Sequence, residues 1–391
     1  MPNGPDLSTT STPWWEQLPD DFRTRANITD LSPGDWLQAE ATAAVERIAR
    51  IPLACAVAAA MASSLLEPGR VREEFEALRF YEPLARAGDA SRVFLAPAKG
   101  IAIASDRASG PAAAPDIRRL ALRFETPFEP LNPAAAKTFA RMRRNAVSHA
   151  EHWCHGDKPR PTLIVVHGFG MHRHSVYARM LQLEARYRAG YDILLFTYPH
   201  HGPRAEPEAW FSGHGVFGNG LLHFNEVALQ AVHDLRVFID HLRDSGVQRI
   251  GITGISQGGY MASLLAHVDG GLACCIPIVP AVSPIDAFLE WQPTGLLLSQ
   301  LMRSQGVSVA GMRALMAVHN PLSYAPRVAG ERVLIIGGGG DRISSPRHLR
   351  LLHAHWPGSS LHWFPGNHIL HFGRSAYLQR MHALMDRCLM D

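Results

Sequence analysis

The stretch RIGITGISQGGY, Arg249–Tyr260, has the pattern of a buried strand, a tight turn and the start of a helix. Its centre, Gly254-Ile255-Ser256-Gln257-Gly258, matches G-x-S-x-G in the strand–turn–helix setting where that pattern has chemical meaning. A serine at such a corner needs a strained backbone, and side chains two positions before and after it would collide with the neighbouring strand or helix. Its hydroxyl then projects above the sheet at the positive end of the helix. The pattern predicts a nucleophile at Ser256, in preference to an ordinary strand-to-helix turn.

Further apolar strands are predicted on both sides of this corner. They lie in PTLIVVHGFG (161–170), YDILLFTYP (191–199), CCIPIVP (274–280), ERVLIIGGGGD (331–341) and SLHWFPGNH (360–368). A long amphipathic helix is predicted over 224–243. Strands that are apolar on both faces and alternate with helices are typical of a parallel sheet covered on both sides. From about residue 90 onward the chain is therefore predicted to be an α/β domain.

The N-terminal part has a different pattern. Residues 1–30 are rich in Ser, Thr, Pro and Asp and are expected to form a loose arm. Residues 31–87 follow a helical pattern that Pro68-Gly69 interrupts. The expected organisation is an arm and helical extension over 1–89, followed by a catalytic domain over 90–391.

Within the predicted α/β domain, the simple alternation is interrupted twice. Residues 92–130 have an apolar period of two, which predicts two or three strands, and residues 134–153 are expected to be helical. Residues 281–330 stand between two strands and are rich in Leu and Met. Because this segment contains the helical patterns 285–291, 295–303 and 307–319, it is expected to form a cap over the sheet edge.

A nucleophilic serine needs a base, and the base needs an orienting acid. His368 follows the last predicted strand through Pro365-Gly366-Asn367, and Asp341 follows an earlier one through four glycines. Both lie at the carboxyl ends of strands, where open α/β sheets form their sites. The chain order Ser256, Asp341, His368 fits the Ser…Asp…His order of one fold family.

Each partner of the serine has a rival. His371 stands three positions after His368, but His368 follows Gly-Asn directly after the strand and is the preferred base. Asp286 and Glu290 follow the strand at 274–280, yet they fall within the first helical pattern of the cap. Asp341 is therefore the preferred acid.

The glycines of His167-Gly168-Phe169-Gly170 follow another apolar strand, about 90 residues before the serine. Glycines at such a place expose backbone N–H groups, and a tetrahedral oxyanion needs two or more such donors. The N–H groups of Phe169 and Gln257 are the predicted pair. The alternative is a simple turn at the strand end.

Taken together, HGFG, GISQG, the aspartate after GGGG and the histidine of GNH make residues 90–391 resemble the α/β-hydrolase superfamily. The resemblance implies an eight-stranded, mostly parallel sheet flanked by helices and hydrolysis through an acyl-enzyme. It also implies that the cap lines the substrate pocket. The helical segment before residue 90 is not part of the shared core.

Composition and charge argue against several other classes of function and partner. The 391 residues include 38 basic and 35 acidic side chains, so nucleic acid is not expected as a partner. Five cysteines, without a CxxC pair or a signal-peptide pattern, favour a cytoplasmic protein. Residues 51–66 are apolar but too short to span a bilayer, so stable membrane insertion is not expected. His200-His201 are expected to be polar loop residues near the substrate, and no metal or cofactor is expected.

The residues together predict a serine hydrolase of carboxylic esters, with a small-molecule ester that has an apolar part as its substrate. Thioesterase, peptidase and lipase activities would use the same residues. A ligand- or partner-binding protein on the same scaffold, and a membrane-associated lipid enzyme that uses residues 51–66, are the alternatives from other classes. The sequence leaves the oligomeric state open, a homodimer included.

Overall fold

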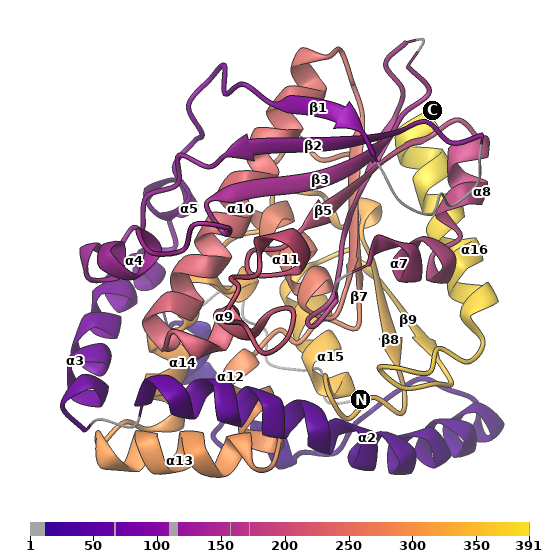
Figure 1. The fold of residues 1–391 in the computed structure, drawn as a ribbon. Helices are drawn as coiled ribbons and strands as arrows, with labels where there is room; N and C mark the ends of the chain where they lie inside the picture. Colours follow the sequence, from indigo (N-terminus) through magenta and orange to yellow (C-terminus); the bar gives the residue numbers. More distant parts are fainter. Residues whose placement is uncertain (1–11, 66–67, 109–115, 157, 172, 391) are drawn as a thin grey trace.

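The computed structural model describes the chain except for residues 1–11, 66–67, 109–115, 157, 172 and 391. Its centre is a nine-stranded sheet in the order β1-β2-β3-β5-β4-β6-β7-β8-β9 (Figure 1). The strands are β1 (Ala104–Arg107), β2 (Arg119–Glu125), β3 (Val147–Trp153), β4 (Thr162–Val166), β5 (Asp192–Thr197), β6 (Ile250–Ile255), β7 (Cys274–Ile278), β8 (Leu334–Gly338) and β9 (Ser360–Phe364).

The sheet is mostly parallel. From β5 to β9 in sheet order, every neighbouring pair is parallel, whereas β1, β2 and β3 pair antiparallel at one side. Parallel strands end at a common edge, so the segments after β4, β6, β8 and β9 meet there. The predicted fold class is confirmed, but the sheet has nine strands rather than the expected eight.

One expected helix is a strand. Residues 134–153 contain helix only at the short η3 (Pro133–Ala135) and α6 (Ala136–Phe139), and Val147–Trp153 is β3. Ala150 is buried on one face of this strand and Trp153 on the other. Because β3 pairs with both β2 and β5, ladder hydrogen bonds and burial override the local helical pattern.

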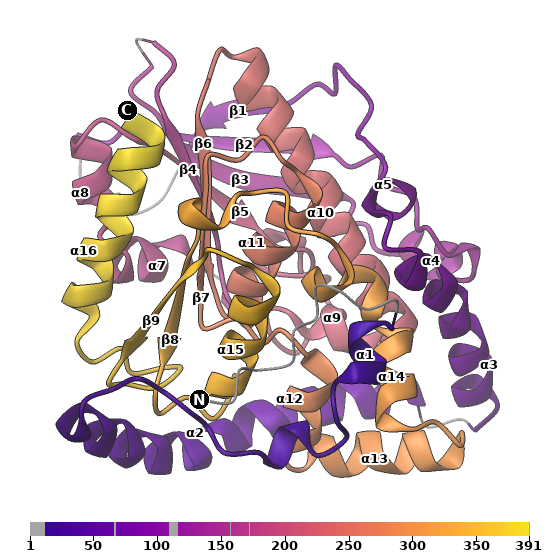
Figure 2. The same ribbon diagram turned by 180° about the vertical axis from the view of Figure 1, so that it is seen from behind.

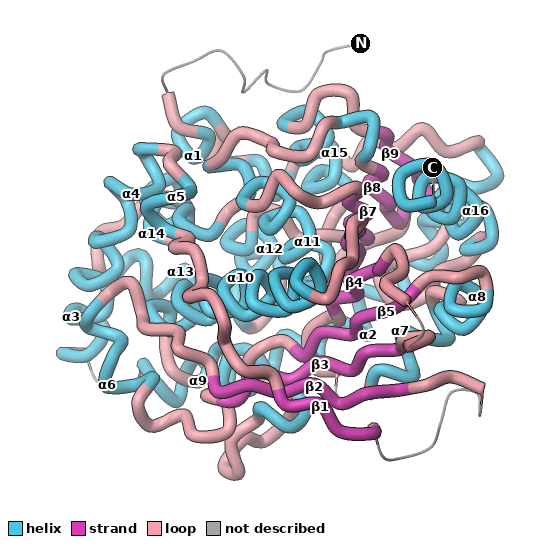
Figure 3. Tube along the Cα trace, turned by 90° about the horizontal axis from the view of Figure 1, so that it is seen from above, coloured by secondary structure: helices cyan, strands magenta, loops and turns pink. Residues whose placement is uncertain are grey.

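Helices cover both faces of the sheet. Seen from behind and from above, α10 and α11 lie on one face and α8 and α16 on the other (Figures 2 and 3). The α-helices are α1 (Trp14–Gln17), α2 (Pro33–Leu65), α3 (Pro68–Leu78), α4 (Glu82–Ala87), α5 (Ala90–Val93), α6, α7 (His174–Met180), α8 (Leu183–Arg188), α9 (His214–Gly218), α10 (Leu221–Asp244), α11 (Gln257–Val268), α12 (Pro284–Glu290), α13 (Thr294–Ser304), α14 (Val309–Leu315), α15 (Pro346–His355) and α16. Helix α16 covers Arg374–Met385, and a π-helical turn follows at Asp386–Met390. Further 3₁₀ turns are η1 (Phe22–Thr24), η2 (Arg79–Tyr81), η4 (Gly202–Arg204), η5 (Ala317–His319), η6 (Pro321–Ser323) and η7 (Gly330–Arg332).

The N-terminal segment packs against the rest of the chain. Trp14, Trp15 and Phe22 are buried, and the Trp14 Nε1–H donates to the Ser323 hydroxyl at 3.0 Å. Beyond residues 1–11, which lie outside the described part, the arm is therefore not loose, because its aromatic side chains pack into the core. The extension is helical as predicted, and α2 crosses below the ends of β8 and β9 (Figure 1). Among the described helices, none combines the length and apolar character needed to cross a bilayer.

The 281–330 segment contains α12, α13 and α14, close to the three predicted helical patterns. Met302, Met312 and Met316 are all buried. The cap helices contact the N-terminal extension, α13 against α2 and α14 against α1. The methionines therefore belong to the main hydrophobic core, a place that suits adaptable thioethers.

Candidate active site

Ser256 occupies the corner between β6 and α11. Its φ of 59° and ψ of −118° lie in a region that non-glycine residues rarely adopt. A Cβ at Gly258 would lie 2.0 Å from the Val166 carbonyl oxygen, and one at Gly254 would lie 2.3 Å from the Gly258 carbonyl oxygen. Both glycines are therefore sterically required, as the pattern predicts. A strained serine held in this way fits a functional site.

Asp341 and His368 are in direct contact. The His368 Nδ1 lies 2.8 Å from the Asp341 Oδ2, and the Asp341 side chain is completely buried. The other carboxylate oxygen accepts the N–H groups of Ile343 at 2.9 Å and Ser344 at 2.6 Å. This arrangement fixes the carboxylate, which in turn fixes the imidazole with its Nε2 free to take a proton.

The environment of His368 favours its charged form. Burial lowers the pKa of His368, but the charge of Asp341, the hydrogen bond to it and the charge of Glu46 raise it. The result is a pKa above the ordinary histidine value. A base of this kind accepts a proton more readily than a free imidazole does.

The sheet brings Ser256 to the same edge as this pair. Ser256 follows β6, Asp341 follows β8 and His368 follows β9, and all three strands run parallel. The Ser256 hydroxyl has no hydrogen-bond partner among the described residues. Nucleophile-to-base contacts are often loose in unliganded sites and tighten when substrate binds.

The HGFG loop packs against the nucleophile corner. A Cβ at Gly168 would lie 3.1 Å from the Ile255 carbonyl oxygen and 3.4 Å from the Ser256 Cβ. The Gly168 N–H donates to the Tyr177 hydroxyl at 2.9 Å, and the Gly170 N–H donates to the His201 Nε2 at 3.2 Å. Among the described residues, the Phe169 N–H between them has no acceptor, and the same holds for Gln257 at the start of α11. Two donors without an acceptor in the described part are thus next to Ser256 in the chain and next to Gly168, which packs against it.

His201 is a residue whose role the sequence did not reveal. It was expected as a polar loop residue near the substrate, but it is fully buried and accepts a hydrogen bond from the HGFG loop. Its Nδ1 lies 2.9 Å from the Pro199 carbonyl oxygen, so Nδ1 carries the proton and Nε2 accepts from Gly170. Burial lowers the pKa of His201 to about 4, which keeps it neutral. The neighbouring His200 is also buried, with its Nε2 2.8 Å from the Nε2 of His223.

Two of the rival residues are engaged elsewhere. His371 Nδ1 lies 2.9 Å from the Tyr377 hydroxyl, and burial lowers the pKa of His371 to about 3. The Glu290 carboxylate contacts the Ser345 hydroxyl at 3.0 Å and the Arg347 guanidinium at 3.1 Å. The His371 Nε2 also donates to the His368 carbonyl oxygen at 3.2 Å, and in the described part of the chain neither rival is hydrogen-bonded to Ser256 or Asp341.

The third rival, Asp286, forms a buried ion pair with Arg313, with Nη2–Oδ1 2.7 Å and Nε–Oδ2 2.9 Å. Arg313 also donates to the carbonyl oxygens of Leu18 and Pro19, which fastens the N-terminal arm to the cap. Replacing Asp286 by asparagine is expected to cost about 3–5 kcal/mol of stability, because it leaves the arginine buried without its counter-ion. Thermal melting checks this. Turnover per folded molecule should stay within about threefold of the native value, because the pair does not touch substrate. Abolished turnover with an unchanged melting temperature would instead make Asp286 the acid.

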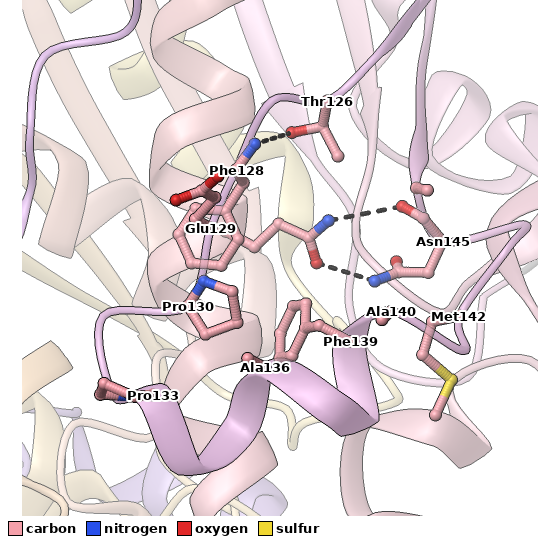
Figure 4. Close-up of a pocket in the computed structure, with 12 residues that line it drawn as sticks. Thr126, Phe128, Glu129, Pro130, Pro133, Ala136, Phe139, Ala140, Met142 and Asn145 are labelled. Atoms are coloured by element: carbon pink, nitrogen blue, oxygen red, sulfur yellow. Dashed lines mark hydrogen bonds between the residues drawn. The ribbon is translucent and has the colours of Figure 1, made fainter.

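The described residues contain no group of three or more His, Cys, Asp or Glu side chains placed to hold a metal ion. A cavity of about 550 Å³ lies between α6, α10 and the segment after β2 (Figure 4). Phe128, Phe139 and Met142 form its apolar wall, and Asn145 Nδ2 donates to the Gln230 Oε1 at 2.8 Å beside it. None of its lining residues belongs to the predicted site.

Known proteins similar in sequence include Rv2627c of Mycobacterium tuberculosis (strain ATCC 25618 / H37Rv) and MT2702 of strain CDC 1551 / Oshkosh, both described as uncharacterized. Each is 32% identical over 217 residues, which cover 54% of this chain and 50% of the relative. The chain therefore spans about half the length of the curated relatives it matches.

Solved structures similar in fold include two acetyl xylan esterases. Acetyl xylan esterase 1 from Thermoanaerobacterium sp. JW/SL YS485 has a TM-score of 0.57 at 15% identity, over 81% of this chain and 98% of that one. The acetyl xylan esterase from Paenibacillus sp. R4 has a TM-score of 0.56 at 16% identity, over 81% and 99% of the two chains. At such low identities the likeness is one of fold.

The model of the alpha/beta hydrolase family matches residues 163–383, which is more than half of the chain. The match includes the HGFG loop, the Ser256 corner and the Asp341–His368 pair, and it leaves out α2. The fold, the arrangement of these residues and this match lead to one conclusion: the chain belongs to the alpha/beta hydrolase family.

Proposed function

We propose that this protein hydrolyses carboxylic esters through an acyl-enzyme, with Ser256 as nucleophile, His368 as base and Asp341 as orienting acid. The Asp341–His368 hydrogen bond, at the sheet edge that also holds the strained serine, is the observation that supports this most. Two of the similar solved structures are acetyl xylan esterases by name, which agrees with an ester substrate.

In the proposed reaction, the His368 Nε2 takes the proton of the Ser256 hydroxyl as the oxygen attacks the ester carbonyl. The Phe169 and Gln257 N–H groups stabilise the oxyanion; losing one such donor costs about 10²–10³-fold in turnover in known cases. His368 then gives its proton to the departing alcohol, and water repeats the sequence on the acyl-enzyme. Asp341 stabilises the imidazolium at each step. The reaction needs no cofactor, since water is the second substrate.

An apolar group on the substrate is part of the proposal. Phe169 packs edge-on against Phe211 and Phe217, with ring centroids 6.0 Å and 5.1 Å from its own, and it carries one of the predicted oxyanion donors. Ile369 and Leu370 directly follow His368 in the chain and are exposed. Apolar side chains next to both the predicted oxyanion donor and the base suit a substrate with an apolar acyl or alcohol group.

Two assays test the proposal. A p-nitrophenyl ester series from acetate to decanoate measures turnover, and a fluorophosphonate probe followed by peptide mapping reports an activated serine. We expect ester turnover with an optimum chain length and a single label on Ser256. A protein that neither reacts with the probe nor turns over any ester, thioester or peptide substrate would instead be a ligand- or partner-binding member of the family.

A further inference from the structure

The N-terminal helix α2 places a carboxylate between the loops that hold the acid and the base. Glu46 is completely buried, although it lies outside the residues that match the family model. Its Oε2 accepts the N–H of Arg342 at 2.5 Å, and its Oε1 accepts the N–H of Ile369 at 3.2 Å. These two residues directly follow Asp341 and His368. One side chain therefore ties together the backbone of both loops.

Other residues of α2 hold the same two loops. The Asn367 Nδ2 donates to the Thr42 carbonyl oxygen at 2.9 Å, next to His368. The Glu40 Oε1 lies 2.6 Å from the Arg342 Nη2. A Cβ at Gly340 would lie 2.2 Å from the Ala39 carbonyl oxygen, so the loop before Asp341 has no room for a side chain against the helix. The contact between α2 and these loops is close and polar along more than one turn.

We propose that Glu46 is a positioning residue for the Asp341–His368 pair, and that α2 is a working part of this active site rather than a dispensable extension. The inference rests on the proposed function for its catalytic meaning. A carboxylate that accepts the N–H after the acid and the N–H after the base sets the spacing of both loops. Misplacing a catalytic group by about 1 Å costs on the order of 100-fold in rate.

The charges around Glu46 give the role a measurable signature. Burial and the charge of Asp341 raise the pKa of Glu46 to about 7, against the opposing effect of His368 and the two N–H groups. Among the described residues, Arg50, one turn further along α2, also interacts with the charge of Glu46, and it donates to the Arg342 carbonyl oxygen. In return, the charge of Glu46 raises the pKa of His368. Removing that charge should therefore lower the pKa of the base.

The test compares Glu46→Gln with Glu74→Gln. Glu74 is a matched control because it is also a carboxylate of the N-terminal extension, and burial raises its pKa too. It accepts the N–H of Leu222 at 3.0 Å and so faces α10 rather than the catalytic loops. The rate of fluorophosphonate labelling at Ser256 is measured against pH for both variants and the native protein, together with kcat and KM for an active ester and the melting temperature. The pKa of His368 is followed by NMR, with His368→Gln used to assign its signal.

For Glu46→Gln we expect labelling and kcat to fall about 10- to 100-fold with little change in KM. The pH at half-maximal labelling and the NMR pKa of His368 should both move down by about half a pH unit or more. Glu74→Gln should lower the melting temperature without changing either pH value. A Glu46→Gln variant that melts lower but keeps the native rate and pH values would overturn the inference, since Glu46 would then only pack the helix.

Two further measurements distinguish a failure of this inference from a folding defect and from a failure of the proposed function. If Glu46→Gln does not fold, Glu46→Asp replaces it, because aspartate retains the charge but is one methylene too short to reach both N–H groups. Glu46→Asp should keep the native pH values but react more slowly, in both labelling and turnover. Unchanged rates in this variant would contradict the positioning role. If the native protein shows no labelling at all, the proposed function fails. The NMR pKa of His368 then still decides whether Glu46 acts on that residue.

Discussion

Replacing Ser256 by alanine should reduce ester hydrolysis by about 10⁴-fold or more and abolish fluorophosphonate labelling. The reason is chemical, because alanine has no oxygen to form the acyl-enzyme. The remaining oxyanion donors and the substrate site should leave only residual catalysis. The variant should fold normally, since the Ser256 hydroxyl makes no hydrogen bond to a described residue. Initial rates with the best p-nitrophenyl ester, at matched protein concentration, provide the measurement.

Ser263→Ala is the matched control for this variant. Ser263 lies in the same helix, α11, is fully buried, and donates its hydroxyl to the Gly259 carbonyl oxygen at 2.9 Å. Its loss should cost about 1 kcal/mol of stability and leave both labelling and turnover close to native. Native-like activity in Ser256→Ala would show that another residue is the nucleophile.

Replacing Asp341 by asparagine should reduce kcat by about 10³–10⁴-fold near neutral pH. The amide oxygen is expected to take the place of the carboxylate oxygen that accepts the N–H groups of Ile343 and Ser344. The amide NH₂ would then face the His368 Nδ1, which must become an acceptor, so that the proton moves to Nε2. A base with its reacting nitrogen already protonated cannot activate Ser256.

The pH dependence separates this effect from simple damage. In the native protein the pKa of His368 is raised, so activity should fall on the acid side with a midpoint above the ordinary histidine pKa. In Asp341→Asn the charge and hydrogen bond that raise this pKa are gone, so the acid midpoint should shift down while the maximum rate stays low. Asp286→Asn, which removes a buried carboxylate elsewhere, provides the control. Equal losses of turnover in the two variants would mean that the effect is structural rather than one of proton transfer.

The features that could be predicted from the sequence depend on interactions between residues that are close together in the chain. The steric demand at Gly254 and Gly258 comes from a turn of a few residues, and it appears in the sequence as spacing. Buried parallel strands appear as short apolar runs, and the glycines after them identify the sheet edge where Asp341 and His368 lie. The helices of the 281–330 segment were likewise predicted to within a few residues.

The errors have a common cause. Val147–Trp153 was expected to be helical, because its pairing with β2 and β5 on either side is invisible in the segment itself. His201 was expected as a polar loop residue near the substrate, whereas it is fully buried and accepts the N–H of Gly170. Trp14 and Trp15 were expected in a loose arm, but they pack into a core supplied by distant residues. In each case a partner far along the chain decided the outcome.

The sequence by itself indicated the family, the apolar parallel strands from residue 161 onward and the candidate residues Ser256, Asp341 and His368, because each depends on short motifs and their order. Only the tertiary structure decided which histidine contacts the acid, how the HGFG loop is supported, and that Glu46 lies between the two loops. Glu46 and Arg342 are 296 positions apart, and no local pattern tells this glutamate from the other charged residues of α2, such as Glu40 and Arg50. Contacts of that range are set by how the elements pack, and packing is a property of the whole chain.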